Sequence, residues 1–303
     1  MKVITVTLNP AFDVYCFSEN FGVHRENLLK IISRDAGGKG INIGRALSAF
    51  SVEVENLVAV GEDNGEELVS RLLAEGLSLS TISLPGRIRE NITVSSDTGP
   101  ETRISFTGFS ADDSLFESAL SAILPSIEAG DVVTFSGRLP AGLTHDGVMA
   151  FLRAIKKSGA RLVLDSHALG RDDIISLSPW LIKPNEEEME RYIGKCRGRE
   201  DIAHAAKELV LSGIENVMVS LGKDGAVLAN SDGVFFKDAP SISVKSTVGA
   251  GDSSIAGFIY ASLRGKSGED LLRYAVAFGS GACMKAGTAA PDIGDVEEIL
   301  SKI

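Results

Sequence analysis

The chain has 303 residues, 44% of them hydrophobic, and can therefore bury a large core or a core with a small appendage. Its formal net charge is −11 and its 30 Lys and Arg residues are scattered, which argues against a nucleic-acid or anionic-membrane surface. Three cysteines without CxxC spacing, and the lack of an apolar run of signal-peptide or membrane-span length, predict a reduced, soluble and cytoplasmic protein.

Short, β-branched apolar runs alternate along the chain with longer segments whose apolar residues recur at helical spacing. The predicted strands are at 3–8, 54–60, 132–135, 162–164, 181–183 and 217–221. The predicted helices are at 41–50, 66–73, 115–127, 148–157, 202–211 and 255–263. This alternation predicts an α/β fold built from βαβ units, with a mostly parallel sheet and helices on both faces.

Residues 91–107 break this pattern, because apolar and polar residues alternate on both sides of the turn-forming sequence at 97–100. Strict alternation around such a turn predicts a β-hairpin. Together with the short apolar run at 14–17, the hairpin predicts a small β-rich subdomain inserted beside the main sheet.

Two polar sites near the N-terminus are candidates for binding hydroxyl groups or an anion. Asp13 follows the first predicted strand, where open α/β sheets bind ligands, although an Asp after a proline also forms turns. Gly37 and Gly38 precede Lys39 and Asn42 at the start of the first predicted helix. This cluster offers bare backbone, an ammonium group and an amide to a ligand, or it is only a glycine-rich connection with a solvated lysine.

Two later segments follow predicted strands and fit a nucleotide. In the segment at 183–188, Asn185 and Glu188 would share one side of a helix's first turn, where they suit phosphate and Mg²⁺-bound water. The same spacing is that of an N-cap with a capping-box acid. The segment at 220–225 turns sharply on small residues, over which a ribose or phosphate chain could lie.

The most informative segment is Ser-Thr-Val-Gly-Ala-Gly-Asp-Ser at 246–253, which follows an alternating run at 242–244 and leads into the last predicted helix. A Gly-Ala-Gly turn at a helix start supplies free N–H groups and a positive dipole end, so it favours an anion. In phosphoryl transfer, the N–H groups of Gly249, Ala250 and Gly251 would stabilise the transferring group. Asp252 would accept the hydroxyl proton, unless it is simply an N-capping residue after a tight turn.

Commoner catalytic motifs do not occur in the sequence. There is no GxxxxGK[ST] or GxGxxG pattern, which argues against a P-loop enzyme or a Rossmann dehydrogenase. There is no GxSxG, HExxH or paired-histidine spacing, which argues against hydrolase and zinc chemistry.

Six motifs occur in order along the chain: TLNPAFD, AGGKGIN, SGRLP, KPNEEE, SLGKDG and STVGAGDS. Together they resemble the phosphofructokinase-B, or ribokinase-like, family of sugar kinases over nearly the whole chain. The resemblance is closest to the branch that contains 1-phosphofructokinase and tagatose-6-phosphate kinase, because that branch also joins TLNPxxD and GGKGxNxxRxL to a late TVGAGDS. It implies a single ribokinase-like α/β domain over residues 1–303, with lid segments at about 12–35 and 86–108.

The resemblance also implies roles for individual residues. It makes Asp252 the catalytic base, with an anion hole formed by Gly249, Ala250 and Gly251. It assigns the sugar hydroxyls to Asp13, Gly37, Gly38 and Asn42, and the substrate phosphate to Lys39 and Arg89. It places around ATP and Mg²⁺ the residues Lys183, Asn185, Glu188, Ser220, Gly222 and Gly225, with Glu188 reaching the metal through water.

Two departures from the family pattern leave the exact substrate open. Arg138 stands where relatives have a serine, so it is either a second phosphate clamp or a solvated side chain. His167 ends an Asp-Ser-His sequence where relatives show Asp-Ser-Ser or Asp-Cys-Ser.

The resulting expectation is an ATP- and Mg²⁺-dependent kinase for a ketohexose phosphate, with fructose 1-phosphate ahead of tagatose 6-phosphate and fructose 6-phosphate. Arg89 favours a phosphorylated substrate over a neutral sugar or a nucleoside. A non-catalytic sugar-phosphate sensor is a further alternative, which the intact Asp252 argues against, because such a base contributes about 10²- to 10⁴-fold in rate. A homodimer formed through the lid is implied, and no nucleic-acid or membrane partner is expected.

Overall fold

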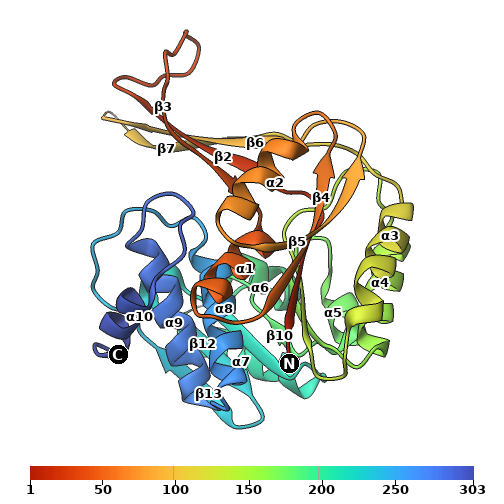
Figure 1. The fold of residues 1–303 in the computed structure, drawn as a ribbon. Coiled ribbons are helices and arrows are strands. Elements are labelled where there is room, and N and C mark those ends of the chain that lie inside the picture. Colours follow the sequence, from red (N-terminus) through yellow and green to blue (C-terminus); the bar gives the residue numbers. More distant parts are fainter. Residues whose placement is uncertain (98, 197) are drawn as a thin grey trace.

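The computed structural model describes residues 1–97, 99–196 and 198–303. Within these residues, nine strands form one large sheet and four strands form a second, small sheet. Figure 1 shows helices packed around the large sheet, while the small sheet projects from the top of the body. The predicted α/β fold, with a mostly parallel sheet and helices on both faces, is confirmed.

The large sheet has the strand order β13-β12-β11-β10-β9-β8-β1-β4-β5. Its strands are β1 (Val3–Thr7), β4 (Val54–Gly61), β5 (Ser78–Leu84), β8 (Val132–Ser136), β9 (Arg161–Asp165), β10 (Leu181–Ile182), β11 (Asn216–Ser220), β12 (Ala226–Asn230) and β13 (Gly233–Lys237). Neighbours from β5 to β11 run parallel, and β12 and β13 are added antiparallel at one edge. Every residue of β1 is buried, as expected for a strand covered on both faces.

Two groups of helices cover the two faces of this sheet, because successive side chains of a strand point to opposite faces. One core cluster contains apolar side chains of α2 (Gly65–Ala74), α3 (Ser114–Ile123), α4 (His145–Lys157), α5 (Arg171–Leu177), α6 (Glu186–Ile193) and α7 (Arg199–Leu211). The other contains those of α1 (Lys39–Ala49), α8 (Ala250–Leu263), α9 (Glu269–Cys283) and α10 (Ile293–Leu300). No described helix is both long and apolar enough to span a bilayer.

The small sheet has the order β3-β2-β6-β7, formed by β2 (Ala11–Ser18), β3 (Lys30–Gly37), β6 (Arg89–Ser96) and β7 (Gly99–Ser105). Strands β2 and β6 pair in parallel, whereas β2–β3 and β6–β7 pair antiparallel. The predicted hairpin is therefore confirmed as β6 and β7. Its predicted turn at 97–100 includes residue 98, which lies outside the described residues.

The run at 242–244, for which the sequence predicted no element, lies in a loop after β13. The Lys245 N–H donates to the Cys283 carbonyl at 2.8 Å, which holds this loop against α9. One local expectation was wrong. The helix expected at 115–127 ends as an α-helix at Ile123, and a 3₁₀ turn containing a proline, Leu124–Ser126, follows.

Candidate active site

Asp252 lies at the centre of the site, in the first turn of α8. The residue is 6% exposed, and its Oδ2 accepts a hydrogen bond of 2.8 Å from Nδ2 of Asn42. Asn42 belongs to α1, which packs against α8 in the same core cluster. The packing of these two helices therefore joins the two glycine clusters, at 36–42 and 246–253, into one site.

Four charged side chains meet at this site. Burial raises the pKa of Asp252 to about 6; the charge of Asp165 adds to this effect, and the Asn42 hydrogen bond, Lys39 and Lys183 oppose it. Lys39 Nζ lies 3.0 Å from Oδ2 of Asp165. Although burial opposes ionisation, Lys183 and Lys39 hold the pKa of Asp165 below its ordinary value. Burial also disfavours the Lys39 charge, yet Asp165 and Asp252 raise its pKa. Asp252 is thus the carboxylate best suited to accept a proton near neutral pH.

The turn before α8 presents backbone N–H groups. Its N-cap residue, Gly249, has φ +79°, a left-handed conformation that favours glycine. The Ala250 N–H makes only a long contact of 3.4 Å to the Thr247 carbonyl. Within the described part of the chain, no acceptor engages the N–H of Gly249 or Gly251. A Cβ on Gly251 would lie 3.1 Å from Lys183 Nζ, so an ammonium group also faces this turn. The turn therefore suits an anion.

A cavity of about 760 Å³ opens beside this turn, and Ala250 and Gly251 form part of its wall. Five of the six residues assigned to the nucleotide line it: Lys183, Asn185, Ser220, Gly222 and Gly225. The rest of the wall is largely apolar and includes Ile242, Val244 and Val276. Its volume and its combination of an apolar wall with a polar end are typical of a site for a nucleotide-sized ligand.

Glu188, the sixth residue, has a structural role. It forms a capping box with Asn185 at the start of α6, with hydrogen bonds of 2.8 and 2.9 Å. Its Oε1 also lies 3.1 Å from Nδ1 of His167. The capping alternative left open by the sequence is therefore present. Glu188 does not line the 760 Å³ cavity; it lines two smaller pockets, one of them together with Lys183 and Asp165.

The small sheet contributes Asp13, which lies against the glycine cluster at the start of α1. Asp13 Oδ1 accepts a hydrogen bond of 2.9 Å from Asn91 Nδ2, and burial raises the pKa of Asp13 despite this bond. A Cβ on Gly37 would lie 2.3 Å from Asp13 Oδ2, so only glycine allows this close approach. Gly38 caps α1 with φ +145°, and a Cβ there would lie 2.7 Å from Thr7. These contacts explain why the cluster contains glycines.

Two guanidinium groups follow from Asp13: Arg89 lies near Asp13, and Arg138 lies near Arg89. Arg89 donates to Asn91 Oδ1 at 2.8 Å and to the Asn9 carbonyl at 3.3 Å. Its Nε is buried and has no partner among the described residues. Burial lowers the pKa of Arg89, and the charge of Arg138 lowers it further. Arg138 is exposed. Two neighbouring guanidinium groups repel each other until an anion lies between them, so this pair suits a phosphate.

Two residues of the site were missed by the sequence analysis as site residues. Asp165 ends β9 and pairs with Lys39, and Asn91 connects Asp13 with Arg89. Asp165 carried a usable signal, because a polar residue at the carboxyl end of a buried parallel strand marks the ligand-binding edge. Asn91 carried none, since its role depends on the register between β2 and β6.

Solved structures of similar fold define the class of protein. Phosphofructokinase-2 from Escherichia coli, in complex with substrates and products, is 27% identical with a TM-score of 0.92, covering 99% of each chain. Ribokinase from Thermotoga maritima is 19% identical with a TM-score of 0.77, covering 99% of this chain and 100% of that one, and supports the fold alone. The fold and the site thus define a ribokinase-like protein with a buried carboxylate at a helix N-terminus.

Sequence comparison gives the family. The family model described as pfkB family carbohydrate kinase matches residues 6–293. The 1-phosphofructokinase of Escherichia coli K12 is 30% identical over 303 residues, covering 100% of this chain and 97% of the relative. That of Bacillus subtilis is 33% identical over 279 residues, covering 92% and 91%. The chain belongs to the pfkB family of carbohydrate kinases, which confirms the resemblance carried by the six motifs.

Proposed function

We propose that this protein is an ATP-dependent sugar-phosphate kinase that phosphorylates a hydroxyl group of a ketohexose phosphate, with fructose 1-phosphate as the leading substrate. The position of Asp252 carries the proposal. Its carboxylate is buried and faces Asn42, while the turn before it lines the 760 Å³ cavity. The relatives named 1-phosphofructokinase support the choice of substrate.

In the proposed reaction, Asp252 accepts the proton of the sugar hydroxyl as its oxygen forms a bond to the γ-phosphorus of ATP. The bond from this phosphorus to the β–γ bridging oxygen breaks, and ADP leaves with the electron pair. The N–H groups of Gly249, Ala250 and Gly251 donate to the phosphoryl oxygens that carry the charge of the transition state. A pKa of about 6 leaves Asp252 ionised at neutral pH and still basic enough to take the proton.

We assign the nucleotide to the 760 Å³ cavity, with Lys183 near the phosphates and Asn185, Ser220, Gly222 and Gly225 along its wall. Mg²⁺ usually keeps several waters and takes one or two carboxylates together with phosphates. Glu188 fits this habit, because its carboxylate lines a small pocket together with Lys183. Glu188 would hold Mg²⁺ through water, and the ion would neutralise phosphate charge.

We assign the substrate to the space between α1 and the small sheet. Asp13, Gly37, Gly38 and Asn42 would bind sugar hydroxyls. Arg89 and Arg138 would bind the substrate phosphate, and this assignment is supported by the unpartnered Nε of Arg89. Lys39, which the resemblance assigned to the same phosphate, would bind it while its ammonium group stays paired with Asp165.

The test is ADP release from Mg-ATP with fructose 1-phosphate, tagatose 6-phosphate, fructose 6-phosphate, free fructose and ribose, with Asp252→Asn beside the wild type. Turnover of one phosphorylated ketose, lost in the variant, is expected. Turnover of neutral sugars only would remove the phosphate role of the two arginines. Binding of a sugar phosphate without ADP formation would favour the sensor alternative.

We further propose that segments 12–35 and 86–108, which contain most of the small sheet, form a lid, and that two copies of the chain pair through it. Large apolar side chains are exposed on this part of the molecule: Val23, Leu28, Ile31, Ile32, Ile104 and Phe106. Exposed apolar patches of this kind mark interaction surfaces. Ile32→Glu is expected to halve the mass measured by light scattering, whereas an unchanged mass would remove the pairing surface.

We also propose that the enzyme works in the cytoplasm, where ATP and sugar phosphates are available. In the described part of the chain, Cys16, Cys196 and Cys283 are all free thiols, which fits a reducing compartment.

A further inference from the structure

The amide of Asn42 is held from both ends. Its Nδ2 donates to Oδ2 of Asp252 at 2.8 Å, and its Oδ1 accepts a hydrogen bond of 2.9 Å from Nη1 of Arg45. Asn42 and Arg45 lie three residues apart on α1 and therefore share one face of the helix. Arg45 does not touch Asp252 in any described contact, so it can act on the base only through this amide.

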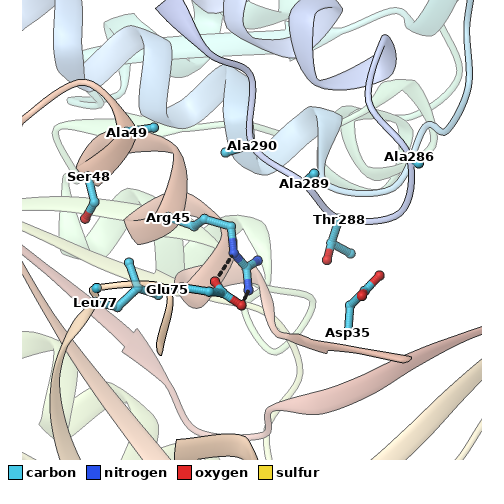
Figure 2. Close-up of a pocket in the computed structure, with 11 residues that line it drawn as sticks. Asp35, Arg45, Ser48, Ala49, Glu75, Leu77, Ala286, Thr288, Ala289 and Ala290 are labelled. Atoms are coloured by element: carbon cyan, nitrogen blue, oxygen red, sulfur yellow. Dashed lines mark hydrogen bonds and ion pairs between the residues drawn. The ribbon is translucent and has the colours of Figure 1, made fainter. Parts of the chain in front are cut away.

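The Arg45 guanidinium is itself fixed by two further groups. Its Nε donates to Glu75 Oε2 at 2.6 Å, and its Nη2 donates to the Ala36 carbonyl at 2.7 Å. Figure 2 shows Arg45 reaching from α1 to Glu75 on the wall of a cavity of about 550 Å³. Only 13% of the Arg45 side chain is exposed, against 38% for Glu75. Hydrogen bonds thus connect Glu75, on the wall of this cavity, through Arg45 and Asn42 to the base.

A guanidinium group has only donors, and an ionised carboxylate has only acceptors. Between Arg45 and Asp252, the Asn42 amide therefore has one favourable orientation. A flipped amide would place its NH₂ group against the guanidinium and its oxygen against the carboxylate, which would make both contacts repulsive. Without Arg45, the flipped amide would lose only one favourable contact, and its oxygen could then accept a hydrogen bond from the O–H of a protonated Asp252.

We infer that Arg45 is a positioning residue for the catalytic base: it fixes the Asn42 amide so that a donor always faces Asp252. The inference rests on the function proposed above. The donor holds one carboxylate oxygen and leaves the other for the sugar hydroxyl. It also favours the ionised form of the base, which is the form that can accept a proton.

The other charged groups that face Asp252 do not depend on this amide. Asp165 of β9 raises the pKa of Asp252, and Lys39 of α1 and Lys183 after β10 lower it. Lys39 is paired with Asp165, away from the Arg45 guanidinium. Loss of Arg45 should therefore raise the pKa of Asp252 by weakening one interaction, while these three charges stay in place.

The first experiment measures kcat against pH for Arg45→Met. We expect kcat to fall about tenfold and the acidic limb of the profile to move up by about one pH unit, with KM for ATP changed less than about twofold. Arg45→Met combined with Asn42→Ala should be no slower than Asn42→Ala alone, because Arg45 acts through Asn42. Multiplied losses, or an acidic limb that stays in place, would overturn the inference.

A matched control removes a guanidinium elsewhere. Arg273 of α9 donates to the carbonyls of Leu300 and Ile303 near the C-terminus. Arg273→Met should lower thermal stability and leave the pH profile of kcat unchanged. Arg45 could instead serve only to hold the Ala36 carbonyl, and Arg45→Met would then behave like this control.

A second readout needs no turnover. The difference in unfolding free energy between proteins with and without Asp252→Asn grows with pH until Asp252 is fully ionised. In the Arg45→Met background, the pH at which it levels off should rise by about one unit. If Arg45→Met does not fold, Arg45→Lys replaces it. A single ammonium nitrogen lacks the three separate nitrogens with which Arg45 reaches its three partners, so a smaller rise is expected. An unchanged pH would refute the inference. A wild type without turnover would refute only the proposed function.

Discussion

Replacing Asp252 by Asn should slow phosphoryl transfer by about 10²- to 10⁴-fold and at the same time stabilise the folded protein. The substitution keeps the shape of the side chain and its acceptor for the Asn42 N–H, but removes a buried negative charge. The two effects have opposite signs because catalysis needs the ionised carboxylate, whereas burial beside Asp165 disfavours it.

The size of the stabilisation follows from the pKa. Its rise from the ordinary value of 3.8 to about 6 costs the ionised folded state about 3 kcal/mol, since a tenfold change in proton affinity is roughly 1.4 kcal/mol. The folded pKa is raised, so this cost is absent below about pH 4, grows as the pH rises towards about 6, and is constant above. Asp252→Asn should thus raise Tm at pH 8 by on the order of 5 °C and leave it unchanged at pH 4.

The expected loss in kcat is about 10²- to 10⁴-fold at pH 8. Both quantities can be measured on the same samples, by coupled ADP release and by calorimetry between pH 4 and 9. In the wild type, kcat should fall below about pH 6, where the base becomes protonated.

Asp131→Asn provides a control with the opposite outcome. Asp131 is also a buried carboxylate, but it accepts hydrogen bonds of 2.9 Å from the N–H groups of Lys2 and Glu128. It precedes the amino end of β8, whereas the site lies at the carboxyl ends of the strands. Its amide variant should lose about 1–2 kcal/mol of stability and keep its activity. An Asp252→Asn protein that is both inactive and less stable would refute the reasoning, as would one that keeps its turnover.

Three further outcomes are expected. Arg89→Ala should raise KM for the sugar phosphate by about 10- to 100-fold with little change in KM for ATP. A variant whose KM for the sugar phosphate equals that of the wild type would show that Arg89 does not bind the phosphate. Lys39→Met should move the acidic limb of kcat to higher pH, because Asp165 loses a partner and the base loses a nearby cation; a limb that moves to lower pH would contradict this charge arrangement. Gly257→Ala should lower the free energy of unfolding by about 1–3 kcal/mol, because the new Cβ would lie 2.5 Å from the Tyr274 carbonyl between α8 and α9. Chemical denaturation measures this free energy, and an unchanged value would contradict the close packing of the two helices.

The buried parallel part of the fold could be predicted, because its strands are continuous apolar runs separated by helices of clear periodicity. Strands β3, β5, β12 and β13 and helices α5, α9 and α10 were missed. β3 and β5 each form an edge of their sheet, and most of their residues are exposed or only partly buried. Such strands are stabilised by their partner strand, and the sequence alone does not contain that partner's register.

The glycine clusters could be predicted as ligand sites for a local reason. Gly38 and Gly249 adopt positive φ at the starts of α1 and α8, and helix starts with bare backbone favour anions wherever they occur. The capping box of Asn185 and Glu188 is local in the same sense. Features that depend only on residues close together in the chain could therefore be predicted from the sequence.

By itself, the sequence determined the fold class, the family motifs and the chemical types of the side chains at the site. Only the tertiary structure decided which of them meet. The Asn42 amide faces Asp252 and Lys39 faces Asp165 because α1, α8 and β9 pack around one end of the large sheet, and Arg45 then fixes the amide. These contacts join residues far apart in the chain, and the periodicity of a single helix fixes which face is buried but not which residue of another element it meets.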